Sequence, residues 1–334
     1  MSTESAADRV DSGFLSQTEV LESGYRELPV SVEAPPIMAV RAGRAVVDGS
    51  GVDPSQITLN THAWIYHQGH DFWAPAHHVA SELGLLNAMP VGISQMCNGA
   101  GIALELAVDH LRSPTRGDTV LMTTADRFCE PGFDRWHGDY GLWYGDGATA
   151  ALLRSTPADG DLHLLSVATD ADSSAEKMHR GDDEFTDSPM AISSVIDIRR
   201  TKRAYLARHG KDAFAATVAD RIPALLTTAF TAAGLSPNDP QLASVVLPRL
   251  GSKALTAAYR PAVAQVTRAP VRDVGAATGH LGAGDLIANM ALLEDDSLCP
   301  PGQMAVVLSA GGGFSWTAAV IRKPSPTTTD KRKS

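Results

Sequence analysis

One cysteine and one histidine stand at equivalent positions of an internal repeat. Cys97 opens residues 97–101, with the sequence CNGAG, and His280 opens residues 280–284, with the sequence HLGAG. A fold made of two similar halves can bring equivalent loops together at its pseudo-twofold axis. A thiol and an imidazole that meet there form a nucleophile and its general base. The repeat therefore predicts covalent catalysis by a cysteine.

Cys97 follows an extended stretch, residues 91–96, and precedes an amphipathic helix expected after Gly99. The dipole and the exposed N–H groups at a helix N-terminus favour the thiolate, which is the nucleophilic form of cysteine. A free cysteine is also commonly a buried core residue. The position between strand and helix, with a histidine at the matching place in the repeat, favours the catalytic interpretation.

His280 lies in a glycine-rich loop, where backbone and ligand can approach closely. Asp285 follows in the first turn of the next expected helix. A carboxylate there either complements the helix dipole or orients the imidazole and stabilises its protonated form, as the acid of a catalytic triad does. Residues 311–313 are three glycines between two expected strands. They form either a plain turn or a loop that aims an N–H group at an oxyanion.

Repeated elements must position these residues. The matched pairs of expected strands are residues 56–61 with 242–247, 119–123 with 304–308, and 149–154 with 317–322. Each half also has an expected helix, one after Gly99 and one after Gly282. Strand–helix alternation with short loops predicts a mostly parallel α/β sheet in each half. We place the two halves at residues 1–158 and 159–334.

The first half is longer than the second between the nucleophile and the last matched strand. The extra residues fall within 127–144, a stretch rich in aromatic side chains. Such an insertion either lines a pocket or a subunit interface, or forms a packed surface hairpin. Its candidate pocket residues are Trp136, Trp143 and Tyr144.

The composition argues against several classes of protein. A net charge of -10 disfavours nucleic acid as the main partner. Three cysteines cannot form a disulfide framework and favour a reducing compartment. No stretch approaches the length of about 18 apolar residues that a membrane span needs, and residues 1–13 lack a signal-peptide pattern. We expect a cytoplasmic protein without a membrane segment.

Two further groups of side chains need an interpretation. Four clustered histidines suggest a metal site, but they lack cysteines at ligand spacing and an HExxH pattern, so we expect no metal. They are His67, His70, His77 and His78. Two basic clusters are either solvated faces or docking surfaces for an acidic partner or a phosphate-bearing cofactor. Their members are Arg199, Arg200, Lys202, Arg203, Arg208 and Lys211, and then Arg249, Lys253, Arg260, Arg268 and Arg272.

Together these motifs resemble thiolase-fold enzymes, and β-ketoacyl-acyl-carrier-protein synthase III in particular. The resemblance covers roughly residues 35–323. It rests on the Cys97 loop, residues 144–148 (YGDGA), the Gly279-His280 loop and residues 311–316 (GGGFSW). It implies a five-layered αβαβα fold, a homodimer, no permanently bound cofactor, and thioester substrates on the phosphopantetheine arm of an acyl carrier protein or coenzyme A. It also implies an oxyanion hole formed by the N–H groups of Cys97 and Gly312.

The chain departs from the synthases where they stabilise an enolate with a histidine and an asparagine. Residues 247–252 (LPRLGS) stand in place of the histidine, and His280 stands in place of the asparagine. A cationic Arg249 cannot act as a neutral donor and acceptor, so we do not expect decarboxylative condensation.

The Gly-His-x-Gly-Ala-Gly-Asp pattern instead resembles the synthase III-like acyltransferases of natural-product pathways, antibiotic pathways among them. These enzymes move an acyl group to a hydroxyl or amine, often on a sugar or aminocyclitol. The resemblance implies a triad of Cys97, His280 and Asp285, with His179 as an auxiliary residue near the pocket. It further implies that the donor docks on the second basic cluster, at Arg249, Lys253 and Arg260.

Two other functions stay open at this point. One is a decarboxylative synthase III, and the other is a non-catalytic partner subunit that sets chain length for a second enzyme. Retention of Cys97, His280 and Asp285 argues against the partner subunit. Malonyl, branched short-chain and aromatic acyl groups all fit the resemblance.

Overall fold

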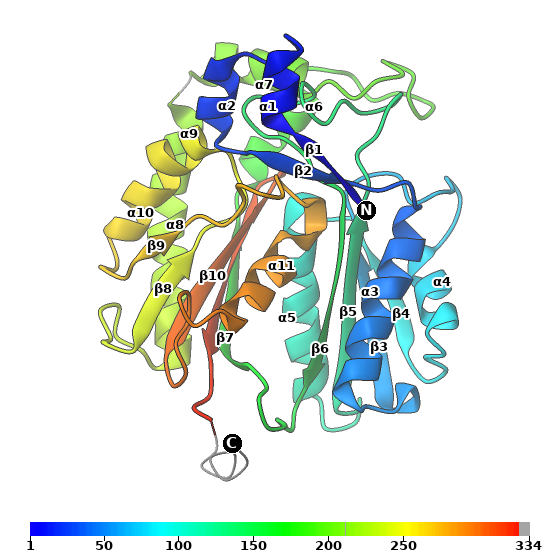
Figure 1. Ribbon diagram of the computed structural model, residues 1–334, viewed down its shortest axis with the longest axis vertical. Helices are drawn as coiled ribbons and strands as arrows, with labels where there is room; N and C mark the ends of the chain where they lie inside the picture. The colour runs from blue at the N-terminus through cyan, green and yellow to red at the C-terminus, as the bar shows by residue number, and fades with distance from the viewer. Residues whose placement is uncertain (211, 327–334) are drawn as a thin grey trace.

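The structure, a computed structural model, describes residues 1–210 and 212–326. Strands and helices alternate along most of the chain (Figure 1). The strands are β1 (Ser2–Ser5), β2 (Glu27–Val30), β3 (Ile57–Ala63), β4 (Met89–Ile93), β5 (Thr119–Asp126), β6 (Gly147–Arg154), β7 (His163–Ala171), β8 (Leu242–Val246), β9 (Val271–Arg272), β10 (Met304–Gly311) and β11 (Ser315–Arg322). The helices are α1 (Ala6–Asp11), α2 (Gln17–Ser23), α3 (Pro35–Ser50), α4 (Pro75–Glu82), α5 (Gly99–Arg112), α6 (Lys177–Arg180), α7 (Ile198–His209), α8 (Ala213–Ala233), α9 (Ser252–Ala254), α10 (Arg260–Ala264) and α11 (Asp285–Ala291).

The two large sheets share a four-strand pattern, as the repeat predicts, and the second sheet adds β7 at one edge. The first has the order β4-β3-β5-β6 and the second β7-β11-β10-β8-β9. In each sheet a parallel pair, β3 with β5 or β8 with β10, continues into an antiparallel partner, β6 or β11. A smaller sheet pairs β1 with β2 near the N-terminus.

Helices cover both faces of each sheet and make five layers, α-β-α-β-α (Figure 1). Helices α3 and α4 pack on the outer face of the first sheet, and α8 and α10 on the outer face of the second. Helices α5 and α11 form the middle layer, in a core cluster with residues of both sheets. This is the αβαβα order that the resemblance implies.

The middle layer explains the small residues of α5. A helix between two sheets must be apolar on more than one side and must let both sheets approach. Ala100, Ala103, Leu104 and Ala107 are all fully buried in α5. The Cys97 and His280 loops enter this layer at the N-terminal ends of α5 and α11.

The extra residues of the first half form a long connection between β5 and β6, where residues 312–314 suffice between β10 and β11. Trp136 and Trp143 in this connection pack with Tyr25 and Leu28 of the N-terminal segment. The indole N–H of Trp136 also donates to Glu4 Oε2 at 2.9 Å. The expectation that these two tryptophans line a pocket is therefore wrong, because their side chains fill a core cluster against the N-terminal elements.

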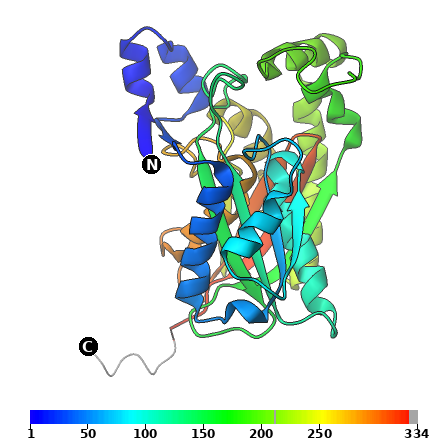
Figure 2. The same ribbon diagram turned by 90° about the vertical axis from the view of Figure 1, so that its right-hand side faces the viewer.

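The N-terminal helices and the α6–α7 segment lie at the same end of the molecule, on opposite sides in Figure 2. Within the described part of the chain, none of the helices combines the length and apolar character that crossing a membrane requires.

Candidate active site

Cys97 lies in the short turn η2 (Met96–Asn98), which joins β4 to α5. Met96 has a φ of 49°, a left-handed conformation that is uncommon for a residue other than glycine. Cys97 is only 7% exposed. Because α5 begins at Gly99, the thiol stands at the positive end of the helix dipole.

The second half of the chain packs directly against the Cys97 turn. The side-chain amide of Asn98 donates to the hydroxyls of Ser315 at 3.1 Å and Thr317 at 3.0 Å, both on β11. A Cβ atom added to Gly311 would lie 2.4 Å from the backbone nitrogen of Asn98. Only glycine permits this approach, so the end of β10 and the Cys97 turn fit closely together.

His280 and Asp285 form a buried pair in the equivalent turn of the second half. The Nδ1 atom of His280 lies 2.6 Å from Oδ2 of Asp285, and Asp285 Oδ1 accepts the N–H of Leu281 at 2.8 Å. The carboxylate therefore holds both the imidazole and the loop backbone. Nε2 of His280 is buried and has no hydrogen-bond partner within residues 1–210 and 212–326.

The charges around His280 favour an imidazolium. Burial alone lowers its pKa through desolvation, but the charges of Asp285 and Cys97 more than offset this and hold the pKa well above its usual range. A Cβ atom added to Gly99 would lie 3.2 Å from the Cβ atom of Ala283, so the turn that carries Cys97 lies against the turn that carries His280. Within the second turn, the imidazole of His280 is paired with Asp285.

The segment before β6 fixes the His280 loop. The N–H of His280 donates to the carbonyl of Trp143 at 2.9 Å, and the N–H of Gly145 donates to the carbonyl of His280 at 3.0 Å. The ring of Tyr144 packs edge-on against the imidazole, with centroids 5.3 Å apart. The Tyr144 hydroxyl donates to Asp139 at 3.0 Å. Tyr144 thus contacts the site, whereas Trp143 contributes only its backbone.

Sequence reasoning misses Asp126, the last residue of β5. This carboxylate is fully buried and accepts three backbone N–H groups, those of Ile65 at 2.8 Å, Tyr66 at 2.9 Å and Ala283 at 2.9 Å. Its strand position corresponds to Gly311, the last residue of β10. An aspartate where the other half has a glycine is the signal that could have found it.

His179 on α6 lies against the glycine loop. A Cβ atom added to Gly312 would lie 2.6 Å from Cε1 of His179, and the imidazole is 5.4 Å from the ring of Phe314. The Nδ1 atom is buried without a partner in the described residues. Burial, helped by the charge of Lys202, lowers the pKa of His179 to about 4, so this imidazole is neutral at pH 7.

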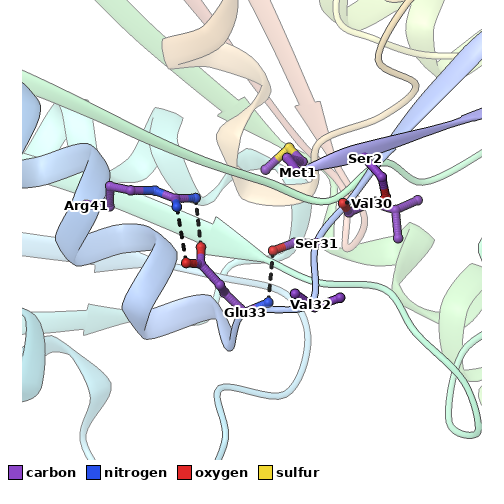
Figure 3. Close-up of a pocket in the computed structure, with 7 residues that line it drawn as sticks. All are labelled: Met1, Ser2, Val30, Ser31, Val32, Glu33 and Arg41. Atoms are coloured by element: carbon purple, nitrogen blue, oxygen red, sulfur yellow. Dashed lines mark hydrogen bonds and ion pairs between the residues drawn. The ribbon is translucent and has the colours of Figure 1, made fainter.

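One cavity of about 300 Å³ adjoins His179 between α6 and α7. Its other lining residues include Arg180, Ile196 and Arg200. A second cavity, of about 380 Å³, lies beside β1 and β2, where Arg41 pairs with Glu33 at 2.7 Å (Figure 3). It contains none of the predicted site residues, whereas His179 is the one predicted site residue that lines the first cavity.

Arg249 does not belong to an exposed docking surface, which corrects the prediction for this residue. It is 3% exposed, and its guanidinium donates to Asn289 Oδ1 at 2.8 Å and to the hydroxyl of Thr278. Burial lowers its pKa from the ordinary arginine value. Lys253 is exposed and pairs with Glu22 at 2.7 Å, and Arg260 is half-buried. Donor docking on Lys253 and Arg260 stays a prediction.

The first basic cluster is largely paired with acidic side chains. Lys202 contacts the buried Asp139 at 2.6 Å, Arg200 pairs with Asp183 at 2.5 Å, and Arg208 pairs with Asp182 at 3.1 Å. Lys211 lies outside the described residues. These contacts reduce the positive charge that the cluster offers to a partner.

The four clustered histidines make no metal-binding group in the structure. His67 lies 3.5 Å from Asp71, and the rings of His70 and His78 pack near Trp73. Among residues 1–210 and 212–326, no three His, Cys, Asp or Glu side chains are placed to hold a metal ion.

Comparisons with known proteins agree with this fold. Residues 91–173 match the family model of 3-oxoacyl-[acyl-carrier-protein] synthase III. The chain is 27% identical over 286 residues to the β-ketoacyl-[acyl-carrier-protein] synthase III of Roseiflexus sp. (strain RS-1), covering 85% of this chain and 82% of that protein. The matched family region contains Cys97 and the whole β5–β6 connection.

Solved structures extend the similarity to nearly the whole chain. The acyltransferase ChlB3 superposes with a TM-score of 0.87 at 27% identity, covering 97% of this chain and 95% of that one. The 3-oxoacyl-[acyl-carrier-protein] synthase III of Aquifex aeolicus VF5 superposes with a TM-score of 0.75 at 18% identity, covering 96% and 95%. The similarity to the Aquifex protein supports the fold alone. The two superpositions together confirm the predicted thiolase fold.

Proposed function

We propose that this chain, a synthase III-like protein with the thiolase fold, is an acyltransferase that works through an acyl-Cys97 intermediate. The donor is a thioester on an acyl carrier protein or coenzyme A, and the acceptor is a hydroxyl or amine of a small molecule. The observation that carries the proposal is the buried group of Cys97, His280 and Asp285. Its imidazole is oriented through Nδ1 at 2.6 Å and leaves Nε2 without a protein partner in the described chain.

In the first half-reaction, the Cys97 thiolate attacks the carbonyl carbon of the donor thioester. The carbonyl oxygen becomes an oxyanion, for which the N–H groups of Cys97 and Gly312 are the proposed donors. Collapse of this intermediate breaks the carbon–sulfur bond to the phosphopantetheine arm, and His280 Nε2–H protonates the departing thiolate. The loss of one such oxyanion donor typically costs about 3 kcal/mol of transition-state stabilisation.

In the second half-reaction, neutral His280 takes the proton of the acceptor hydroxyl or amine through Nε2. The acceptor oxygen or nitrogen attacks the acyl carbon, and the second oxyanion collapses to release the Cys97 thiolate and the ester or amide. Asp285 keeps the proton on Nδ1 and stabilises the imidazolium, the role of the acid in a triad.

The environment of Arg249 supports transfer over decarboxylative condensation. A condensing site must stabilise an enolate with neutral hydrogen-bond donors. Arg249 is instead a buried cation whose donors are engaged by Asn289 and Thr278. His280, at the other position where the synthases differ, is committed to Asp285.

The cavity beside His179 suits the acceptor. The volume of this cavity, about 300 Å³, is at the lower end of the range for small-molecule sites. His179 lines the cavity and also lies against Gly312 in the glycine loop. Its neutral imidazole can accept or donate a hydrogen bond to a polar acceptor. We propose a sugar or aminocyclitol-type molecule of a natural-product pathway, and a cytoplasmic homodimer as the working form.

A decarboxylative synthase III is the second candidate. The name of the Roseiflexus relative favours it, because that protein is 27% identical over most of its length. The deciding experiment supplies the acylated protein with malonyl-carrier protein in one arm and with a panel of sugar and aminocyclitol acceptors in the other. Transfer of the acyl group to an acceptor without release of carbon dioxide supports the acyltransferase, and a β-ketoacyl product supports the synthase.

A further inference from the structure

The carboxylate of Asp126 joins loops from the two halves of the molecule. Its Oδ1 accepts the N–H groups of Ile65 and Tyr66, in the loop that follows β3. Its Oδ2 accepts the N–H of Ala283, in the loop that carries His280. One side chain therefore ties the loop of the candidate base to the half that contains the nucleophile.

The His280 loop is shaped to receive this carboxylate. Gly282 has a φ of 64°, and a Cβ atom there would lie 2.3 Å from Oδ2 of Asp126. A side chain at position 282 would both strain the backbone and displace the carboxylate. The glycine is thus needed for the contact between Asp126 and Ala283.

The contact with the N–H of Ala283 brings the carboxylate of Asp126 to the loop of His280, three residues along the chain from the imidazole. Burial raises the pKa of Asp126 to about 7, while the three backbone N–H groups and the charge of His280 act in the opposite direction. The groups that face His280 are Asp285 from α11, Cys97 from η2 and the ring of Tyr144. Asp126 adds a second carboxylate, from the end of β5.

We propose that Asp126 is a positioning residue that holds the His280 loop against the first half and supports the imidazolium with its negative charge. This role rests on the proposed function, in which His280 carries a proton between two half-reactions. Once Cys97 is acylated, the thiolate charge is lost. The carboxylates of Asp285 and Asp126 then remain to set the proton affinity of the base.

The test is a histidine titration by NMR in the full-length Cys97→Ala variant, which lacks the thiolate. The His280 signal is assigned by its loss in His280→Gln. Adding Asp126→Asn should move the His280 midpoint down by about one pH unit, because an opposite charge at short range favours the protonated form. It should also speed hydrogen exchange of the Ala283 amide at least about tenfold, since one carboxylate acceptor is lost.

An unchanged His280 midpoint in a folded Asp126→Asn variant would overturn the proposal, because a purely structural carboxylate leaves the titration unmoved. If the variant does not fold, the ¹³C signal of the Asp126 carboxyl in Cys97→Ala serves instead. That signal should shift at the His280 midpoint, and the absence of any response there also overturns the proposal. Neither readout needs an acyl donor, so this inference and the proposed function can fail separately.

Discussion

The Nδ1 atom of His280 lies 2.6 Å from Oδ2 of Asp285, and the same carboxylate accepts the N–H of Leu281. This contact fixes which imidazole nitrogen faces the reaction. With Nδ1 bound to Asp285, Nε2 is the nitrogen left to exchange a proton with Cys97, the donor thiol and the acceptor.

His280→Ala should lower acyl transfer by about 10²–10⁴-fold, the usual contribution of a general base. Asp285→Asn should impair transfer less, because Asp285 acts through the histidine. The double variant should be little worse than His280→Ala alone, since the two residues serve one function. Single-turnover transfer rates with circular dichroism as a folding control check this. Full activity of Asp285→Asn would contradict the orienting role of Asp285, whose carboxylate would then only complement the dipole of α11.

A buried histidine on β3 should make the protein sensitive to acid. His62 is fully buried, and desolvation lowers its pKa to about 4. Below pH 6.5 the unfolded chain binds a proton at this histidine, whereas the folded protein does not until about pH 4. The free energy of unfolding should therefore fall as the pH falls through this window, by about 2 kcal/mol between pH 7 and pH 5 from His62.

Urea unfolding at pH 7 and pH 5 tests this dependence. The loss of stability between the two pH values should be smaller in His62→Gln than in the wild type. His77→Gln, at an exposed position of α4, is the matched control and should keep the wild-type difference. An equal pH dependence in His62→Gln and the wild type would contradict the assignment.

The donor should dock on Lys253 and Arg260 of the second basic cluster. The double variant Lys253→Glu/Arg260→Glu should raise the KM for a carrier-bound donor at low salt, because an acidic carrier protein is steered by positive charge. The KM for a minimal pantetheine thioester should stay unchanged. Arg112→Glu, an exposed change at the C-terminal end of α5, is the control. Unchanged kinetics of the double variant with the carrier-bound donor would remove this docking surface.

The fold and the equivalent positions of the Cys97 and His280 loops could be predicted because they depend on local patterns that the chain repeats. Strand pairs, the small residues of α5 and the matched Cys97 and His280 loops are all visible in the sequence. Arg249 and the tryptophans could not be placed, because their burial depends on partners distant in sequence. Arg249 contacts Asn289, and Trp136 contacts Glu4. Asp126 was missed for the same reason, since its partners come from two segments distant in sequence, the loop after β3 and the His280 loop.

Decarboxylative condensation should be absent or very slow. With malonyl-carrier protein and an acylated enzyme, we expect neither carbon dioxide nor a β-ketoacyl product, since Arg249 and His280 are engaged by Asn289 and Asp285. A β-ketoacyl synthase III assayed with the same substrates is the positive control. Robust turnover would falsify the transferase assignment and establish the synthase instead.

The central claim is that Cys97 alone carries the acyl group. Incubation with a panel of acyl-carrier protein and acyl-coenzyme A thioesters, followed by intact-protein and peptide mass spectrometry, measures this directly. The predicted result is a single acyl adduct on the peptide that contains Cys97, absent from Cys97→Ala. An adduct on Cys129 or Cys299 with Cys97 unmodified, or no adduct with any donor, would contradict the account.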